Sequence, residues 1–318
     1  MVARAIAATR KRFCVRCYIP TPHHQTVWAR WYGPIVERFR VWATDEPAVR
    51  AALIVGSQAR TRDPADEWSD LDVVIFHNNP EQLLGSTDWI GNFGDVVLTT
   101  VEPTAVLGSR ERRVLYSNGK DVDFAVFPSA ALEFVAQSPE GLSVLGRGYE
   151  VLLDKDGQLS KPVASLESRV HDQQKLPSEE QFQSDVADFW YHVPWAAKKL
   201  RRGELWVAKM VCDCYLKMVL IRMIEWQTIV RRGNGTDVWH DGRFVDRWAE
   251  PEVRARLPET FAQYDRKDLA RALNATGRLF SDLAREVASE RKWVYPEEAE
   301  SIVWTIVGST LKDVGVES

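Results

Sequence analysis

The segment "LIVGSQARTRDPADEWSDLDVVIF" (53–76) contains two apolar runs separated by a polar stretch. The first run ends in Gly56-Ser57, and the second run has Asp70 and Asp72 at its start. Residues two apart in a strand share a face, so both carboxylates project together from a strand otherwise built for burial. Two adjacent ionised carboxylates repel each other and are costly to bury unpaired, and a divalent cation removes both problems. We therefore expect Asp70 and Asp72 to bind magnesium.

Gly56 and Ser57 stand where the first of these strands ends. A glycine allows a phosphate group to approach the backbone closely, and a serine hydroxyl can donate a hydrogen bond to it. If "SQART" (57–61) begins a helix, the free N–H groups of its first turn add to this anion site. Arg60 is a weaker candidate for a phosphate contact. A phosphate site beside a carboxylate pair that binds magnesium predicts nucleotidyl or phosphoryl transfer.

A third carboxylate comes from "KDVDFAVF" (120–127), where Asp121 and Asp123 share a strand face and Asp123 lies deeper in the apolar run. The preceding Asn118-Gly119 is a strong signal for a type I′ hairpin turn, which would set the register of this strand. Three acids on neighbouring strands can hold two metal ions, one at the attacking hydroxyl and one at a triphosphate. A lone Asp-x-Asp is more often a turn or a solvated edge, but its combination with Gly-Ser and an interior aspartate favours metal-dependent chemistry.

The composition narrows the class of protein. The chain has 318 residues, of which 45% are hydrophobic, so it can bury a sizeable core and suggests two domains. Its net charge of −4 gives no sign of a nucleic-acid partner, and no apolar run reaches the roughly 18–20 residues of a membrane helix. The cysteines form one lone CxxC pair, Cys14 and Cys17, so we expect reduced thiols in a cytoplasmic protein.

The apolar periodicities predict an α+β protein, with an N-terminal mixed sheet flanked by helices and a C-terminal α-helical bundle. For the first part we expect a helix over 28–42, strands over 51–55, 71–76 and 95–101, a hairpin over 112–127 and a strand with a turn over 150–157. For the second part we expect helices over 178–193, 204–230, 258–289 and 296–313, the first with Ser178 as N-cap. The predicted boundaries are 1–27 for a basic N-terminal extension, 28–165 for the sheet domain and 166–318 for the helical domain. For the extension we expect a disordered segment or an upstream start codon, and the alternative is a transit-like or basic arm.

The fingerprint "VGSQAR", "SDLDVVIF" and "VDFAVF" resembles that of the nucleotidyltransferase superfamily of the DNA polymerase β type. Within it, the chain is most similar to the aminoglycoside 6-adenylyltransferases, also called streptomycin adenylyltransferases. The segments "FGDVVLTTVEP" (93–103), "VLLDKDG" (151–157) and "DFWYHVPWAAKKLRRGELWVAKMVCD" (188–213) extend this resemblance over roughly residues 30–310. The chain departs from the family pattern at Leu71, where an aromatic residue is common, and before Trp28, where no counterpart is evident.

This resemblance implies a reaction and its site residues. The enzyme would use ATP as co-substrate and two magnesium ions. It would transfer AMP to a hydroxyl of an aminoglycoside such as streptomycin, release pyrophosphate and so confer antibiotic resistance. By matched position, Gly56 and Ser57 hold the triphosphate, and Asp70, Asp72 and Asp123 hold metal. The general base is expected to be Asp95, which opens the third strand, with Asp123 as its rival. Residues 28–165 would then be the nucleotidyltransferase domain and residues 166–318 the acceptor-binding domain.

The acceptor pocket is expected in the helical domain. Asp185, Asp188 and His192 are spaced i, i+3 and i+7 on one helix face, with Trp190 close by, and an acidic and aromatic face suits a polycation. The alternative is a solvated stripe beside core tryptophans. Lys198 and Lys209 match the family's Ala-Lys pairs and could reach the triphosphate, or they are solvated, snorkelling lysines.

Other functions stay open at the level of the sequence. The same chemistry could act on another small-molecule hydroxyl, such as a lincosamide, or on a protein side chain, and a third alternative is an inactive nucleotide-binding module. For the leading reading we expect a small-molecule acceptor, no nucleic acid, no membrane, and a monomer or homodimer.

Overall fold

The computed structural model describes residues 27–60, 63–104, 108–135, 138–159, 176–238 and 241–312. The chain divides into two compact units, Met1–Asp172 and Gln173–Ser318, and each is described by itself below. The predicted boundary between residues 165 and 166 lies outside the described residues, as do residues 1–26 of the predicted extension. None of the helices in the described ranges is long and apolar enough to span a membrane.

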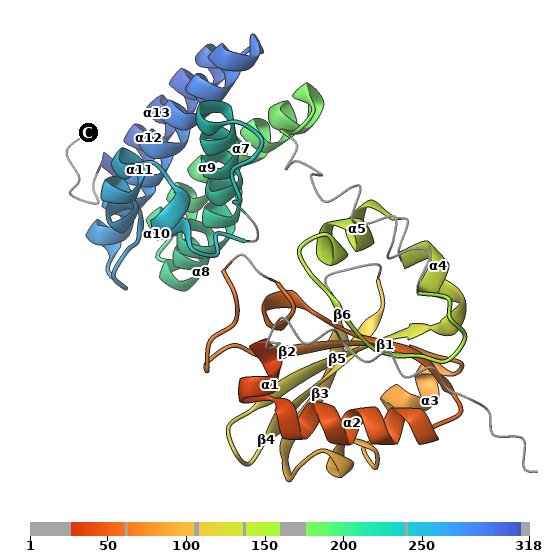
Figure 1. Ribbon diagram of the computed structural model, residues 1–318. Coiled ribbons are helices and arrows are strands. Elements are labelled where there is room, and N and C mark those ends of the chain that lie inside the picture. Colours follow the sequence, from red (N-terminus) through yellow and green to blue (C-terminus); the bar gives the residue numbers. More distant parts are fainter. Residues whose placement is uncertain are drawn as a thin grey trace, which may run out of the picture. The chain divides into compact units, whose positions relative to one another are not determined.

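The first unit is built on a six-stranded sheet with strand order β3-β4-β5-β2-β1-β6 (Figure 1). The strands are β1 Val49–Val55, β2 Leu71–His77, β3 Val96–Pro103, β4 Arg110–Tyr116, β5 Asp121–Pro128 and β6 Glu150–Asp154. β2 and β5 are parallel and the other neighbours are antiparallel, so the sheet is mixed, as predicted. Each strand that the apolar runs predict is present, with ends that differ by a few residues.

Helices cover one whole face of this sheet. Helix α2 (Gly33–Asp45) lies along the sheet (Figure 1). Its apolar side packs Phe39 against Phe124 and neighbouring core residues. The short elements α1 (Val27–Trp31), α3 (Pro80–Gly85) and η2 (Ile90–Asn92) complete this layer. The single helix predicted over 28–42 is in fact two, because Pro34 lacks the N–H that a continuous helix needs and instead starts α2.

The second face is covered at the carboxyl ends of β2 and β5. There Phe76 and Phe127 pack beneath Leu132 and Leu145, which belong to the short elements that follow β5. These elements are η3 Ser129–Ala131, α4 Leu132–Val135 and α5 Pro139–Leu145. Alternation along β2 puts Asp72 on the same face as Phe76, so the carboxylate lies on this second face, toward the amino ends of the strands.

The hairpin between β4 and β5 has a different turn from the predicted one. A type I′ turn needs a positive φ at both central residues, but only Gly119 has one, at +77°, and Asn118 does not. The Gly119 N–H donates to the Tyr116 carbonyl, and the Tyr116 N–H donates to the Lys120 carbonyl. The loop is therefore a three-residue loop, a type I turn closed by a left-handed glycine, and it pairs Arg113 with Asp123, whereas the predicted two-residue turn would have paired Val114 with Asp123.

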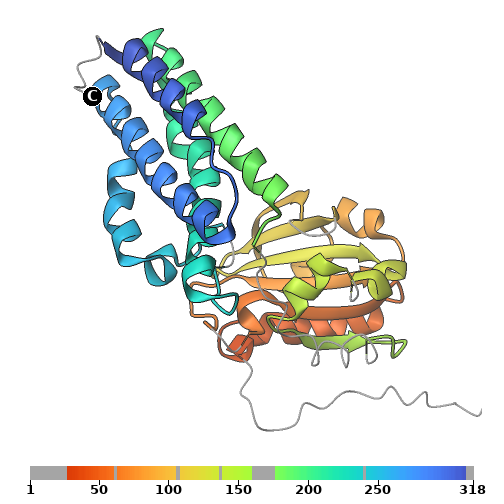
Figure 2. The ribbon, with the colours of Figure 1, turned by 90° about the horizontal axis from the view of Figure 1, so that it is seen from above.

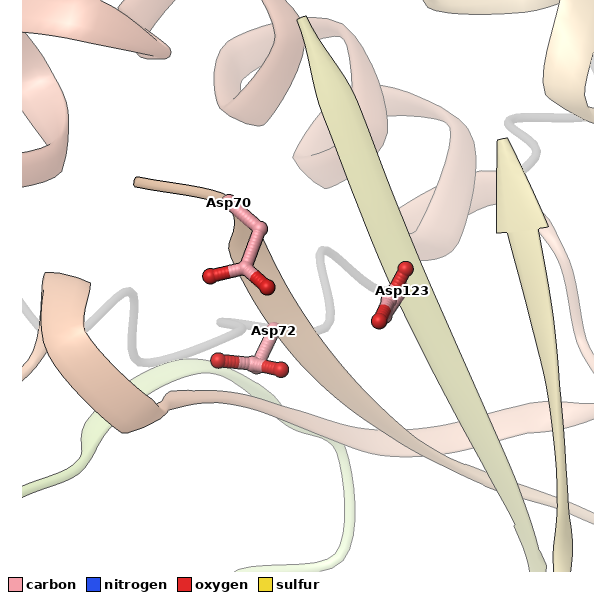
Figure 3. Close-up of side chains that lie close together, drawn as sticks. All are labelled: Asp70, Asp72 and Asp123. Carbon is pink, nitrogen blue, oxygen red and sulfur yellow. The ribbon is translucent and has the colours of Figure 1, made fainter. Parts of the chain in front are cut away.

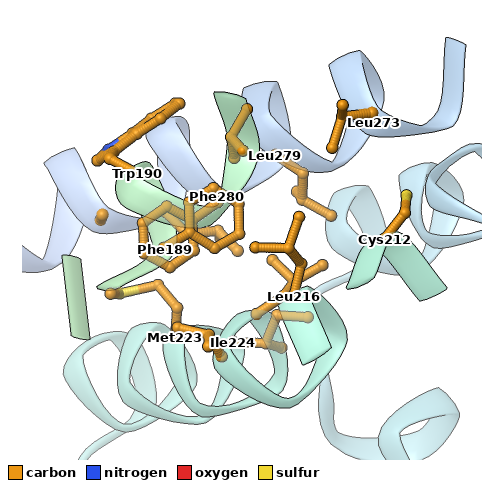
Figure 4. Close-up of a cluster of buried hydrophobic side chains, with 14 of the residues drawn as sticks. Phe189, Trp190, Cys212, Leu216, Met223, Ile224, Leu273, Leu279 and Phe280 are labelled. Atoms are coloured by element: carbon orange, nitrogen blue, oxygen red, sulfur yellow. The ribbon is translucent and has the colours of Figure 1, made fainter. Parts of the chain in front are cut away.

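The second unit is a helical bundle, as predicted, and contains no strand among its described residues. Its elements are α7 Glu179–Arg201, α8 Leu205–Met210, η4 Val211–Tyr215, α9 Leu216–Arg232, α10 Val245–Trp248, α11 Pro251–Arg256, η5 Leu257–Thr260, α12 Arg266–Arg291 and α13 Glu297–Leu311. Helix α7 runs beside α12 and α13 (Figure 2). Phe189 of α7 stacks on Phe280 of α12 in the centre of the core (Figure 4).

Two helices of the bundle differ from the predicted ones. The pattern over 204–230 is interrupted by a π-helical turn, η4, between α8 and α9. The helix predicted from residue 258 starts only at Arg266, because the Asp265 side chain accepts the N–H groups of Lys267 and Asp268 and so caps α12 there. The predicted N-cap of α7 is confirmed, since the Ser178 hydroxyl accepts the Gln181 N–H at 3.1 Å.

Candidate active site

Three carboxylates meet at the amino ends of β2 and β5 (Figure 3). Asp72 and Asp123 are register partners on these parallel strands, and Asp70 precedes Asp72 by two residues on the same face. One oxygen from each of the three side chains lies within 4.8 Å of the other two. All three are half-buried, so their mutual repulsion is poorly screened by water. This is a donor set of hard oxygen ligands that fits a magnesium ion.

The electrostatic environment of Asp123 reflects this crowding. Burial raises the pKa of Asp123 to about 7, while the Arg113 guanidinium, 3.3 Å away, lowers it and the neighbouring carboxylates raise it. Arg113 lies directly opposite Asp123 on β4 and also pairs with Glu102 and Glu111. One arginine thus balances only part of the negative charge around Asp123, and a divalent cation would offset the rest.

Gly56 is required by the geometry of the turn after β1. It has a φ of +69°, and a Cβ atom at this position would overlap the Asp72 carboxylate oxygen. Ser57 follows in the single 3₁₀ turn η1 (Gly56–Gln58) and is 3% exposed, and its hydroxyl has no hydrogen-bond partner among the described residues. A buried hydroxyl without a partner costs stability, and a phosphate oxygen could accept a hydrogen bond from it.

The helix expected over 57–61 does not form where the structure describes this segment. Because η1 is one short turn, the backbone here presents no helix N-terminus for a phosphate. Arg60 is buried, and its Nε donates to the Asp63 carbonyl at 2.8 Å. Of the residues predicted to contact a phosphate in this segment, Gly56 and Ser57 therefore lie in the turn beside Asp72, whereas Arg60 already donates to a backbone carbonyl.

Asp95 does not join the three carboxylates. It is exposed just before β3, the edge strand, and β4 lies between β3 and β5. Its carbonyl accepts the Ser117 N–H at 2.8 Å, which ties it to the hairpin loop. Of the two predicted bases, Asp123 is the one that lies in the carboxylate cluster.

Two of the residues predicted to bind the acceptor form an aromatic and acidic cluster in the helical unit. The Tyr215 hydroxyl donates to the Asp188 carboxylate at 2.9 Å, and His192 lies 3.2 Å from the same carboxylate. The His192 and Tyr215 rings lie 4.3 Å apart. Asp185 lies on the same helix but is buried and ion-paired with Arg222 at 2.7 Å, so its charge is already balanced.

The remaining predicted residues lie elsewhere in the helical unit. Trp190 is buried in the core and donates its indole N–H to the Tyr295 hydroxyl at 2.9 Å, away from the Asp188 face. The Lys209 ammonium group donates to the Asp213 carboxylate and to the Ala262 carbonyl, so its hydrogen bonds are made within the helical unit. Lys198 is exposed near the C-terminal end of α7.

Sequence reasoning missed Arg113 and Tyr215. Arg113 could not be found by counting back from the predicted two-residue turn at Asn118-Gly119, which would place Val114 opposite Asp123; the observed three-residue loop shifts the register by one residue and places Arg113 there. Tyr215 could not be found either, because it ends the π-helical turn Val211–Tyr215, and this turn shifts the helical phase of every later residue.

The chain is similar to known adenylyltransferases over most of its length. The family model described as streptomycin adenylyltransferase matches residues 30–307. An aminoglycoside 6-adenylyltransferase of Campylobacter jejuni is 22% identical over 266 residues, covering 82% of this chain and 89% of the relative. One of Staphylococcus aureus is 20% identical over 260 residues, covering 80% and 89%.

A solved structure, an aminoglycoside 6-adenyltransferase from Bacillus subtilis, is 18% identical, with a TM-score of 0.42 over 87% of this chain and 96% of that one. The family model matches far more than half of the chain, and it includes the Gly-Ser turn and all three clustered carboxylates. The chain therefore belongs to the streptomycin adenylyltransferase family of nucleotidyltransferase enzymes.

Proposed function

We propose that the enzyme transfers AMP from ATP to a hydroxyl group of an aminoglycoside such as streptomycin and releases pyrophosphate. Family membership and the names of the relatives support the reaction and the class of acceptor. The observation that carries the proposal is the cluster of Asp70, Asp72 and Asp123 within 4.8 Å, beside the turn in which Ser57 has an unpaired hydroxyl. Antibiotic resistance would be the biological consequence.

Each site residue has a part in this reaction. Gly56 leaves room for the Asp72 carboxylate, and we assign the triphosphate to this turn, where the Ser57 hydroxyl would donate to a phosphate oxygen. Asp70, Asp72 and Asp123 would hold Mg²⁺, as two ions in the full complex. Bound magnesium supplies charge neutralisation at the triphosphate and lowers the pKa of the attacking hydroxyl.

The proton and the leaving group follow from these assignments. The acceptor oxygen forms a bond to the α-phosphorus, and the bond from that phosphorus to the bridging oxygen breaks, so pyrophosphate leaves with the electron pair. Asp123 is the better placed group to take the proton of the acceptor hydroxyl, because Asp95 lies outside the cluster. The acceptor's cationic groups bind at Asp188, where Tyr215 and His192 form the flat sides of the site.

The test is pyrophosphate release by purified enzyme with ATP and magnesium, with streptomycin, a lincosamide or a protein substrate as acceptor. Release that depends on streptomycin and on magnesium is expected. Asp72→Asn should abolish it with an unchanged circular-dichroism spectrum, whereas Asp88→Asn, an exposed acid of the same unit, should not. If pyrophosphate is released with a lincosamide or a protein substrate but not with streptomycin, the proposed acceptor class is wrong. If the protein binds ATP without needing metal and shows no turnover, it is an inactive nucleotide-binding module.

A further inference from the structure

Asp70 differs from the other two carboxylates in how its backbone is held. Asp72 and Asp123 lie inside the sheet, where the register of β2 and β5 fixes them. β2 begins only at Leu71, whose pairing with Val122 is the first of that ladder. Asp70 therefore lies just outside the sheet, and a different support must set the direction of its carboxylate.

The side chain of Gln58 supplies this support. Its Nε2 donates to the Asp70 carbonyl at 3.1 Å and to the Ser69 carbonyl at 3.4 Å. Gln58 is 1% exposed, and its Oε1 has no partner among the described residues, so its amide group serves these two carbonyls. The orientation of the amide is fixed by chemistry, because only the nitrogen can donate to carbonyl oxygens.

Two further side chains hold the same lead-in segment. The hydroxyl of the buried Tyr32, which directly precedes α2, donates to the Ser69 carbonyl at 2.9 Å. The Lys120 ammonium group donates to the Glu67 carbonyl at 3.0 Å. Donors from three distant parts of the chain thus hold three nearby carbonyls that lead into β2.

We propose that Gln58 is a positioning residue that orients the Asp70 carboxylate for binding a divalent cation, and that Tyr32 supports this orientation by holding the Ser69 carbonyl. The inference rests on the metal site of the proposed function. Gln58 belongs to the same 3₁₀ turn as Gly56 and Ser57, so its side chain fixes the phosphate turn and the first metal ligand relative to each other. Residues that orient a metal ligand commonly contribute about 10–100-fold to metal affinity.

Gln58→Met tests this by removing the donor while keeping the length of the side chain. Mn²⁺ binding is measured by electron paramagnetic resonance on the full chain, without ATP or acceptor. We expect the affinity to fall by about tenfold or more. Gln227→Met is the matched control, because Gln227 is also fully buried. Its amide nitrogen donates to Glu286, and its amide oxygen has no hydrogen-bond partner among the described residues. It lies in the helical unit and should leave Mn²⁺ affinity unchanged.

A double mutant separates positioning from general loss of structure. If Gln58 acts through Asp70, then Gln58→Met should change Mn²⁺ affinity by less than about twofold when Asp70→Asn is already present. If Gln58→Met lowers Mn²⁺ affinity as much in the Asp70→Asn background as in wild type, Gln58 does not act through Asp70. Equal Mn²⁺ affinities of Gln58→Met and wild type would also overturn the positioning role.

The remaining outcomes are also decisive. If wild type itself binds no Mn²⁺, the metal site of the proposed function fails, and this inference fails with it. If Gln58→Met does not fold, Tyr32→Phe replaces it, because it deletes one hydroxyl only. A weaker Mn²⁺ affinity of Tyr32→Phe supports the positioning role, and an unchanged one overturns it.

Discussion

At the scale of single residues, the site depends on how closely the backbone at Gly56 approaches Asp72. Two independent features favour glycine at this position: the backbone has a positive φ, and a Cβ atom would overlap the Asp72 carboxylate. The next residue, Ser57, has a buried hydroxyl that finds no hydrogen-bond partner among the described residues. The close approach of Gly56 to Asp72 and the buried Ser57 hydroxyl support the proposed phosphate site more strongly than the Gly-Ser sequence alone does.

Gly56→Ala should therefore impair the metal site more than backbone strain alone would. The left-handed conformation costs alanine about 1–2 kcal/mol, and its Cβ would also displace the Asp72 carboxylate. We expect Mn²⁺ affinity to fall at least about tenfold. The control is Gly157→Ala, because Gly157 has a φ of +66° but open space around it. Equal Mn²⁺ affinities of the two variants would contradict the close-approach argument.

Among the site residues, the three clustered carboxylates were the most predictable from sequence. Alternation places Asp70 and Asp72 on one face of a strand, and the apolar run places Asp123 inside the second strand of the hairpin. That this strand lies beside β2 follows only from the strand order. That Asp95 lies outside the cluster could not be predicted, because it depends on the strand order, in which β4 separates β3 from β5. The partners of Asp185 and Lys209 come from other helices, and one helical periodicity does not reveal them.

At the scale of elements, apolar runs predicted all six strands, because each run is bounded by turn residues. The errors lie where backbone chemistry acts locally. Pro34 divides the first helix, Asp265 delays the start of α12, and the π-helical turn Val211–Tyr215 interrupts a continuous apolar pattern. Hydrophobic periodicity does not record such breaks, since the buried face continues through them.

Helix α9 carries a carboxylate that makes the stability of the helical unit depend on pH. The pKa of Glu225 is raised to about 7, mainly by burial and in part by Asp241, against the Gly242 N–H and Arg222, which lower it. The native state therefore binds this proton more tightly than the unfolded chain. The free energy of unfolding should fall as pH rises from about 4.5 towards about 7, and this contribution should then stay constant.

Glu225→Gln should remove this dependence, because an amide resembles the protonated acid and can still accept the Gly242 N–H. We expect the variant to be more stable than wild type at pH 8, by about 1–3 kcal/mol, with the difference shrinking towards pH 5. Urea denaturation at both pH values measures it. A difference that is the same at pH 5 and pH 8 would count against the raised pKa.

At the scale of the whole molecule, the two units carry different tasks in the proposed reaction. The clustered carboxylates and the Gly-Ser turn belong to the first unit, and the Asp188 cluster belongs to the second. The sequence pattern predicts the same division into two units, because strand patterns stop after residue 157 and long amphipathic helix patterns begin at Ser178. Metal binding and acceptor binding should therefore respond to different mutations.

Asp188→Asn should raise the KM for streptomycin about 10–100-fold, because it removes a charged hydrogen-bonding group from the acceptor site. Mn²⁺ affinity and the KM for ATP should stay the same. Asp282→Asn is the control, because Asp282 is an exposed acid of the same unit, paired with Arg256. An unchanged KM for streptomycin in Asp188→Asn would remove this cluster from the acceptor site.

The most direct test of the central claim is mass spectrometry of the acceptor after incubation with wild-type enzyme, ATP and Mg²⁺. The account predicts that streptomycin gains one AMP unit, that chelation of the metal stops the reaction, and that Asp72→Asn gives no product. Adenylylated streptomycin formed at the wild-type rate by Asp72→Asn, or no adduct on any aminoglycoside with wild-type enzyme, would contradict it.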